Sequence, residues 1–172
     1  MIMDCVQARK TLIRAAGLPA RRALDVGMGG CACMSLLLAA KGFNVISIDR
    51  STKAVHEARR KAKGHSLRGS LAARLGDAEH MPFRDDEFDV VLAYRSLHHA
   101  RNAERVAREM FRVCRKGGVV LIAEFNDRGR HECERARDNA QLVARIQRLF
   151  RTLATDTERI ETNRDTMFVC RK

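Results

Sequence analysis

Short apolar runs alternate along the chain with longer stretches in which apolar residues recur every three to four positions. The runs are typical of β-strands, and the longer stretches have the periodicity of amphipathic α-helices. Strands are predicted at 22–26, 44–49, 71–75, 88–93 and 119–125, with a closing hairpin at 157–163 and 166–170. Helices are predicted at about 1–16, 34–40, 52–63, 102–116 and 131–153.

Polar residues and glycines mark the expected ends of two of these helices. Ser51 and Asn102 are expected N-caps, because their side-chain oxygens can accept hydrogen bonds from the free N–H groups of a first helical turn. Gly64 is expected to end the first of the two helices and Gly117 the second.

Strands that alternate with helices predict an α/β fold with a doubly wound, parallel sheet and helices on both faces. Ligands of such sheets bind beyond the carboxyl ends of the strands. We therefore expect the loops after Val26, Asp49, Gly76 and Ala93 to share one ligand-binding rim.

Length and composition fit one globular domain. The chain has 172 residues, of which 45% are hydrophobic and 31% charged. No apolar run approaches the roughly 20 residues of a membrane span, and charged residues interrupt the N-terminal segment, so a cytoplasmic protein is expected. The six cysteines are interpreted mainly as small buried residues, and no metal site is predicted because only Cys31 and Cys33 form a close pair.

The formal net charge of +12 favours an anionic partner such as RNA, a phosphorylated metabolite or a membrane surface. Aromatic residues that could stack on bases do not interleave the basic runs, so RNA is not the favoured interpretation. The run Arg59-Arg60-Lys61 with Lys63 lies on the helix after the second strand, where a solvated face is the simpler explanation.

The first rim loop reads Asp25-Val26-Gly27-Met28-Gly29-Gly30-Cys31. Glycines after a strand allow a tight turn and a close approach of the backbone to a ligand, and the following helix N-terminus favours an anionic group. Asp49 ends the second strand, where a carboxylate can accept hydrogen bonds from two ribose hydroxyls. Gly27, Gly29 and Ala32 also satisfy a dinucleotide-binding pattern, so these features alone leave the cofactor open.

A third segment, 76–91, follows the third strand and reads GDAEHMPFRDDEFDVV. Together with the loop at 25–29 and the segment RVCRKGG at 112–118, it resembles the class I S-adenosylmethionine-dependent methyltransferase family. The resemblance is strongest to the branch that includes ubiquinone and menaquinone biosynthesis methyltransferases, and it covers roughly 20–125. It implies a mostly parallel, seven-stranded sheet whose last strand is antiparallel.

The resemblance also implies a single domain, 1–172. An N-terminal helix would occupy 1–20, the cofactor-binding core 21–125, and a C-terminal helix with closing strands 126–172.

In the first motif, the resemblance assigns Asp25 to the acid that organises the loop and the methionyl ammonium of S-adenosylmethionine. Gly27 and Gly29 would lie under the methionyl and ribose parts. Met28 and Met81 are expected to supply apolar contacts to the adenosine.

Further along the chain, Asp49 corresponds to the ribose-binding acid, and its neighbour Arg50 is assigned to the cofactor site with it. Asp77 corresponds to the acid near the adenine amino group, with the Ala78 backbone N–H facing the ring. Tyr94 follows the fourth strand, where the family lines the path of the reacting methyl group.

Candidate catalytic residues follow the same strand. His98 and His99 resemble paired histidines common in this branch, and an imidazole titrates close enough to neutral pH to act as a general base. Tyr94 is the third candidate, and lining the pocket is the simpler role for the histidines. Arg95 and Arg101 are expected nearer the acceptor, where either could hold an anionic substrate.

One position departs from the family pattern. Cys31 stands where the first motif usually has a third glycine. Its side chain is compatible with binding if it points between sheet and helix, and it could instead crowd the methionyl end.

Three functions therefore remain open. The favoured one is methyl transfer from S-adenosylmethionine, with S-adenosylhomocysteine as product, to an unidentified small molecule, and an anionic acceptor is one candidate. The second is a non-catalytic cofactor- or RNA-binding module with the same fold, and the third is a nicotinamide-dependent oxidoreductase. Residues 93–96 lack the asparagine or aspartate, two prolines and aromatic of adenine-type methyltransferases, which disfavours that chemistry. Acceptor contacts could come from a homodimer partner.

Overall fold

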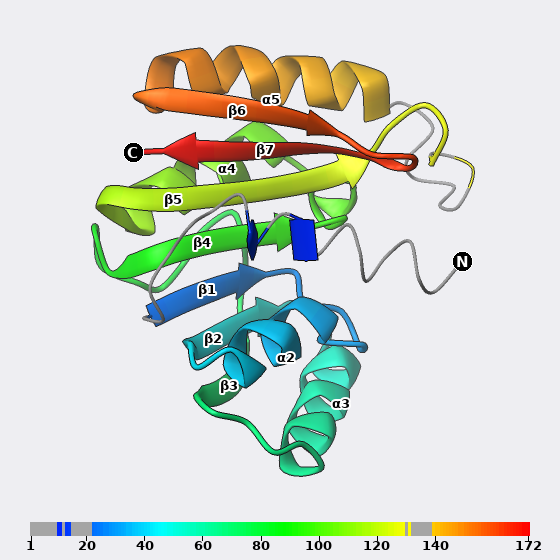
Figure 1. Ribbon diagram of the computed structural model, residues 1–172, viewed down its shortest axis with the longest axis vertical. Helices are drawn as coiled ribbons and strands as arrows, with labels where there is room; N and C mark the ends of the chain where they lie inside the picture. The colour runs from blue at the N-terminus through cyan, green and yellow to red at the C-terminus, as the bar shows by residue number, and fades with distance from the viewer. Residues whose placement is uncertain (1–9, 12, 15–21, 130, 132–138) are drawn as a thin grey trace.

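A computed structural model describes residues 10, 11, 13, 14, 22–129, 131 and 139–172. Within them, seven strands form one sheet in the order β3-β2-β1-β4-β5-β7-β6 (Figure 1). The strands are β1 (Arg22–Val26), β2 (Asn44–Asp49), β3 (Ser70–Leu75), β4 (Phe88–Tyr94), β5 (Cys114–Phe125), β6 (Asp156–Glu161) and β7 (Asp165–Arg171).

Strands β1 to β5 are parallel, whereas β7 inserts antiparallel between β5 and β6. The sheet is therefore the mostly parallel, seven-stranded sheet that the sequence predicted, with its last strand antiparallel. The strand order reverses between β1 and β4, which places the expected ligand site where their carboxyl ends diverge.

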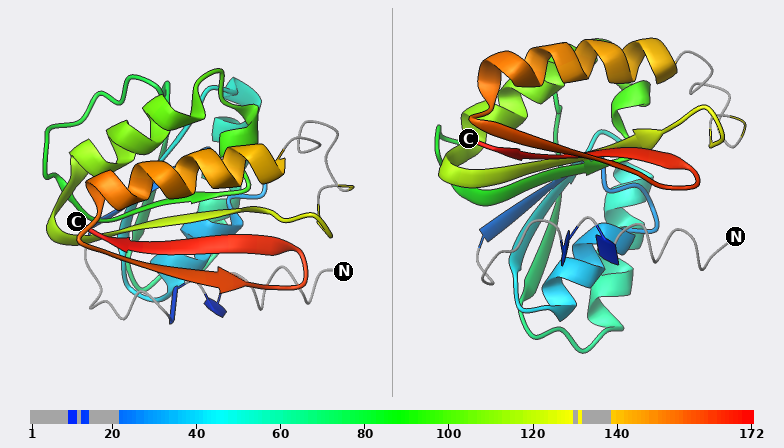
Figure 2. Two further views of the ribbon diagram at one scale, coloured as in Figure 1. Left: turned by 90° about the horizontal axis from the view of Figure 1, so that it is seen from above. Right: turned by 45° about the horizontal axis from the view of Figure 1, so that its top comes forward.

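Helices cover both faces of the sheet, as predicted (Figure 2). Alternate strand residues point to opposite faces, so Ala23 packs in the apolar cluster with α2, and Leu24 packs in the cluster with α4 and α5. The helices are α2 (Cys33–Ala40), α3 (Thr52–Lys63), α4 (Ala103–Val113) and α5 (Asn139–Leu153), with a short 3-10 helix at Leu97–His99.

Both predicted N-caps are confirmed. Ser51 Oγ accepts a hydrogen bond from the Ala54 N–H at 3.2 Å, and Asn102 Oδ1 accepts one from the Arg105 N–H at 3.0 Å. Gly64 ends α3 as expected. These local signals fix where α3 and α4 begin, and thereby the lengths of the loops on the carboxyl rim.

The predicted helix over 102–116 is wrong in its last turn. Helix α4 ends at Val113, and β5 already begins at Cys114, which pairs with Phe88. The Gly117 N–H donates to the Lys172 carbonyl at 3.0 Å, with Gly117 at a φ of 70°. Because Phe88 of β4 and Lys172, directly after β7, pair with this segment, an extended backbone replaces the last helical turn.

Two other predicted helices are only partly described. Residues 10, 11, 13 and 14 are helical, and the rest of the predicted helix at 1–16 lies outside the described residues. Helix α5 confirms the prediction from Asn139 onward, and 130 and 132–138 lie outside the description.

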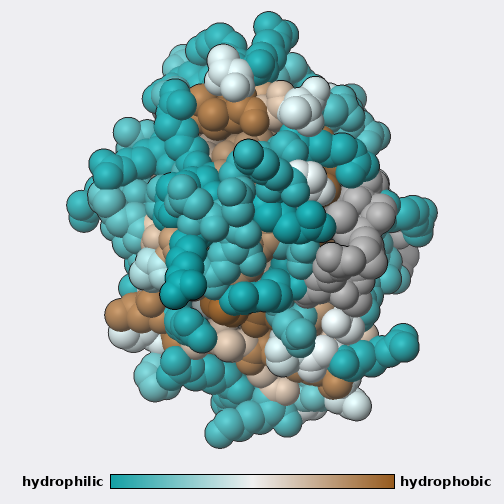
Figure 3. Space-filling view, turned by 90° about the vertical axis from the view of Figure 1, so that its left-hand side faces the viewer, coloured by the Kyte–Doolittle hydropathy of each residue, from teal (hydrophilic) through white to brown (hydrophobic). Residues whose placement is uncertain are grey.

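The side of the molecule that carries the amino ends of the parallel strands is largely hydrophilic, with smaller apolar patches between polar side chains (Figure 3). Among the described helices, none is both long enough and apolar enough to cross a bilayer.

Candidate functional site

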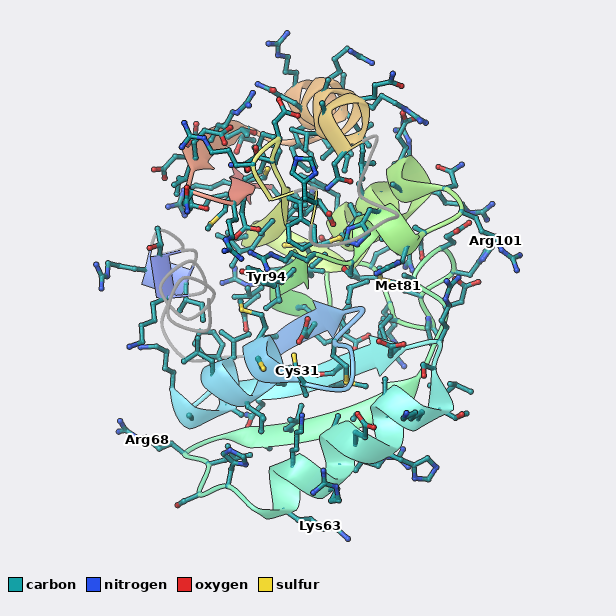
Figure 4. The ribbon with its side chains drawn as sticks, turned by 90° about the vertical axis from the view of Figure 1, so that its right-hand side faces the viewer. Cys31, Lys63, Arg68, Met81, Tyr94 and Arg101 are labelled. Atoms are coloured by element: carbon teal, nitrogen blue, oxygen red, sulfur yellow. The ribbon has the colours of Figure 1, made fainter. Side chains whose placement is uncertain are left out.

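A cavity of about 410 Å³ opens at the carboxyl ends of the parallel strands, the side that faces the viewer in Figure 4. The cavity lies where the strand order reverses. Nine of the ten residues predicted to contact the cofactor line it: Asp25, Gly27, Met28, Gly29, Asp49, Arg50, Asp77, Ala78 and Tyr94. The fold therefore gathers loops that lie far apart in the chain, from Asp25 to Ala100, into one pocket of ligand-binding size.

Close packing at Gly27 determines the conformation of the glycine-rich loop. This residue has a φ of +74°, and its N–H donates to the Ile48 carbonyl at 2.9 Å. A Cβ at Gly27 would lie 2.6 Å from the Ser96 Cβ. Only glycine fits between β1 and the loop after β4, and its presence keeps the strand-end backbone open to a ligand.

Asp49 holds the glycine-rich loop from the neighbouring strand. Its Oδ2 accepts a hydrogen bond from the Gly29 N–H at 2.9 Å, and its Oδ1 accepts one from the Ser51 N–H at 2.9 Å. An ionised carboxylate has about four acceptor sites, so both oxygens can accept further hydrogen bonds. Asp49 can therefore order two loops and still accept hydrogen bonds from ligand hydroxyls.

Asp25 lies at the floor of the cavity with an exposed fraction of only 1%. Burial raises the pKa of its carboxyl to about 7, although the Ser35 hydroxyl, which donates to Oδ2, opposes the rise. Ser35 also lies 2.7 Å, oxygen to oxygen, from Ser47 on β2. The Asp25 carboxyl thus sits in a hydrogen-bonded chain inside the sheet, and its charge changes close to neutral pH.

The third loop presents an exposed acid, Asp77, to the cavity. The Glu79 N–H donates to Asp77 Oδ1 at 2.9 Å, and this bond, aided by nearby His80, holds the pKa of Asp77 below its usual value. Met28 lines the cavity, whereas Met81, its predicted companion, is 4% exposed within the core and does not contribute to the lining (Figure 4). The apolar contact expected from Met81 is therefore not seen.

Cys31 lies in the cavity wall beside Cys33, and it is exposed (Figure 4). Its side chain is not buried between sheet and helix, which rules out the first of the two arrangements considered from the sequence. The left-handed backbone of this loop falls at Gly27, Gly29 and Ala32, with φ values of 74°, 60° and 46°, and not at Cys31. A side chain at position 31 therefore introduces no left-handed strain.

The two adjacent histidines have different surroundings. His99 is exposed and lines the cavity. The His98 side chain is 2% exposed, and its Nδ1 lies 2.6 Å from Glu124 Oε2. Glu124 also accepts hydrogen bonds from the Leu97 N–H at 2.7 Å and from the Asn139 amide at 3.3 Å. This arrangement fixes the loop after β4, which in turn places His99 at the cavity.

Tyr94 and Arg95 meet a buried acid from β7. The Arg95 guanidinium donates to both carboxylate oxygens of Asp165, at 2.6 and 3.0 Å, and lies 4.3 Å from the ring centroid of Phe125. The Tyr94 hydroxyl donates to Asp165 at 3.3 Å. The charge of Arg95 is thus already compensated by Asp165, which argues against the anion-holding role considered for it.

Arg101 is exposed and projects away from the centre of the carboxyl rim, so it does not join the cavity wall (Figure 4). Glu124 and Asp165 were not predicted as site residues from the sequence. Glu124 did carry a signal, because a single acid inside the apolar run VVLIAEF must find partners when the strand is buried. Asp165 gave no comparable signal, since its partners lie 70 and 71 residues earlier.

Comparison with known proteins identifies the family to which the chain is similar. Residues 24–122 match a family described as "Methyltransferase domain". Over 124 residues the chain is 37% identical to a demethylmenaquinone methyltransferase of Beutenbergia cavernae, covering 72% of this chain and 49% of that protein. It is 31% identical over 127 residues to the ubiquinone/menaquinone biosynthesis C-methyltransferase UbiE of Vibrio vulnificus, covering 72% and 45%.

Among solved structures, the PH0226 protein from Pyrococcus horikoshii superposes with a TM-score of 0.79 at 19% identity, covering 99% of this chain and 90% of that one. At this identity the likeness concerns the fold.

The matched domain, the strand order and the loops around the cavity together place the chain in the class I S-adenosylmethionine-dependent methyltransferase family. Within that family it belongs with the ubiquinone/menaquinone-biosynthesis-like branch. The chain spans about half the length of the curated relatives it matches.

Proposed function

We propose that the chain binds S-adenosylmethionine in the carboxyl-rim cavity and transfers its methyl group to a small-molecule acceptor. The observation that carries this proposal is the convergence of the glycine-rich loop, Asp49 and the Asp77–Ala78 segment around one cavity of about 410 Å³. Family membership supports the same cofactor.

The lining suits each part of this cofactor. The two carboxylate oxygens of Asp49 are available to ribose hydroxyls, and Met28 and Ile48 offer apolar surface to the adenine. The backbone between Gly27 and Gly29 is approachable because no side chain projects from either glycine. Asp25 lies beneath this loop and can stabilise the methionyl ammonium when ionised.

Bound S-adenosylmethionine supplies a methyl group on a positively charged sulfur, which is a good leaving group. The protein then contributes mainly by orienting the acceptor in line with that group and by excluding water, effects worth up to about 7–11 kcal/mol in ideal cases. Tyr94, the last residue of β4, lines the cavity, and its hydroxyl is oriented by Asp165. His99 is the imidazole that lines the cavity, so we assign it the contact with the acceptor, including removal of a proton where the acceptor carries one.

His98 has a different role in this proposal. Its buried contact with Glu124 positions the loop that carries His99. A quinone-type ring is the first acceptor class to test, because the similar protein of Beutenbergia cavernae is named a demethylmenaquinone methyltransferase.

A cytoplasmic location belongs to the same proposal. Cys114 and Cys170 are buried thiols, and burial raises the pKa of each to about 12. Such use of cysteine as an apolar core residue is typical of proteins in reducing compartments.

The chain offers its own reporter for cofactor binding, because it has no tryptophan and Tyr94 is its one tyrosine. Tyrosine emission should therefore change on titration with S-adenosylmethionine or S-adenosylhomocysteine, and not with NAD. Ligand at 100 times its Kd should add about 2.7 kcal/mol to stability, or roughly 5–10 °C in Tm. A response to NAD alone, or to none of the three, would contradict the proposal.

A matched pair of variants locates the binding site. Asp49→Ala should raise the Kd for S-adenosylhomocysteine at least about 10-fold, because hydrogen bonds to a charged group contribute about 1.5–3 kcal/mol each. Asp156→Ala removes an exposed carboxylate from β6, far from the cavity, and should leave the Kd unchanged. Equal effects of the two variants would place the ligand elsewhere.

A further inference from the structure

Half of the net charge of the chain is concentrated at one end of the sheet. Between Ser51 and Gly76 there are seven basic residues and one acidic residue, a net charge of +6 out of the total of +12. We call these seven residues the α3–β3 basic surface: Lys53, Arg59, Arg60, Lys61, Lys63, Arg68 and Arg74.

This charge is not compensated locally. The ion pairs found within the described residues all involve other parts of the chain, and none includes a residue between Ser51 and Gly76. The one acid of the region, Glu57, faces the loop at Gly30. Six of the seven basic residues are exposed, and Lys63 and Arg68 project outward at the same end of the molecule (Figure 4).

The fold explains why these charges gather. Strand β3 is an edge strand of the sheet, and α3 packs against it. The Arg59 guanidinium donates to the Ala73 carbonyl at 2.9 Å, which ties the helix to the strand. Basic side chains from the helix, the following loop and the strand therefore gather at this edge of the sheet.

The chemistry of this surface favours a bilayer over a nucleic acid. None of the seven residues lines either of the two cavities described for this molecule. No phenylalanine, tyrosine or tryptophan occurs between Ser51 and Gly76 to stack on bases. Leu75, beside Arg74, is the exposed large hydrophobic residue of the described chain, at 58%.

We propose that the α3–β3 basic surface docks the protein on an anionic membrane surface. A basic side chain near an anionic leaflet contributes about 1 kcal/mol, so several acting together bind without a membrane-spanning segment. Leu75 adds an apolar contact at the lipid interface. Strands β2 and β3 end at Asp49 and Leu75, and the residues that follow them, Arg50 and Gly76, line the cavity, so the docked edge of the sheet and the cavity share these two strands. This proposal does not depend on methyl transfer.

The test is partition of the full chain onto vesicles of phosphatidylcholine alone and of phosphatidylcholine mixed with phosphatidylglycerol. We expect binding to the anionic vesicles only, at about 0.1 M salt, and its loss near 1 M, where the screening length falls from about 10 Å to 3 Å. The triple variant Arg60→Gln, Lys63→Gln, Arg68→Gln should lower the partition coefficient about 100-fold, as the loss of three such contributions implies.

A matched control removes the same charge elsewhere. Arg108→Gln, Arg148→Gln, Arg151→Gln replaces three exposed arginines on α4 and α5, and should change partition less than threefold. Tyr94 emission on titration with S-adenosylhomocysteine, measured without vesicles, should be the same for both triple variants and checks that each is folded. Equal loss in both variants, binding to neutral vesicles, absence of vesicle binding, or binding to an RNA oligonucleotide in place of vesicles would each overturn the proposal.

Discussion

Replacing Gly27 by alanine tests the claim that close packing at the end of β1 shapes the cofactor cavity. The new Cβ would lie 2.6 Å from the Ser96 Cβ and 3.0 Å from its Oγ, and the backbone there has a φ of +74°. Left-handed backbone costs a residue with a Cβ about 1–2 kcal/mol, and overpacking costs about 1–3 kcal/mol. We expect a loss of about 2–5 kcal/mol in unfolding free energy.

Gly29 provides the control because it separates backbone strain from steric overlap. Its φ is +60°, but a Cβ there would meet no atom within 4 Å. Gly29→Ala should therefore cost only the backbone strain of about 1–2 kcal/mol. The measurement is urea denaturation followed by far-ultraviolet circular dichroism.

Removing the clashing partner isolates the steric contribution. In a double-mutant cycle, Gly27→Ala combined with Ser96→Gly should recover about 1–3 kcal/mol relative to the sum of the single variants. Ser96→Gly by itself loses the hydrogen bond from its Oγ to the Val26 carbonyl, 2.9 Å long. If Gly27→Ala proves no more damaging than Gly29→Ala, or if the coupling is zero, the packing argument fails.

Three further predictions follow from the site. The pKa of Asp25 is raised to about 7 from 3.8, so the folded state binds more protons than the unfolded state between these values, and stability should fall as pH rises from about 4 to 7. The slope of unfolding free energy against pH reaches at most about 1.4 kcal/mol per pH unit, and Asp25→Asn should remove it. Urea denaturation repeated between about pH 4 and pH 7 measures this slope. His98→Ala should lower the unfolding free energy by about 1–3 kcal/mol, because it leaves the buried Glu124 without one partner. His99→Ala should change the unfolding free energy by no more than about 0.5 kcal/mol, and it should reduce turnover once an acceptor is found. The reverse ranking of the two variants would contradict the assigned roles. Cys31→Gly should change the Kd for S-adenosylhomocysteine by less than about threefold, because the backbone at position 31 is not left-handed and a glycine relieves no strain there. The Kd is measured by the Tyr94 emission titration, and a much tighter complex would show that the thiol crowds the cofactor.

The fold and the cofactor loops could be predicted because their signals are local. Strand composition, helical periodicity and the caps at Ser51 and Asn102 each depend on residues a few positions apart. The error at Cys114–Lys116 shows the limit of such signals. The helical stripe reaches Cys114, but pairing with Phe88 of β4 and hydrogen bonds to Lys172, both distant in the chain, make the segment a strand.

The sequence by itself determined the order of elements and the loops that meet at the rim, since parallel strands bring their carboxyl ends to one edge. Only the tertiary structure decided how individual side chains are used there. It placed His99 in the cavity and His98 against Glu124, and it paired Arg95 with Asp165. Neighbouring residues in a chain can point in opposite directions, and partners 26 or 70 residues apart meet only once the strands are in register.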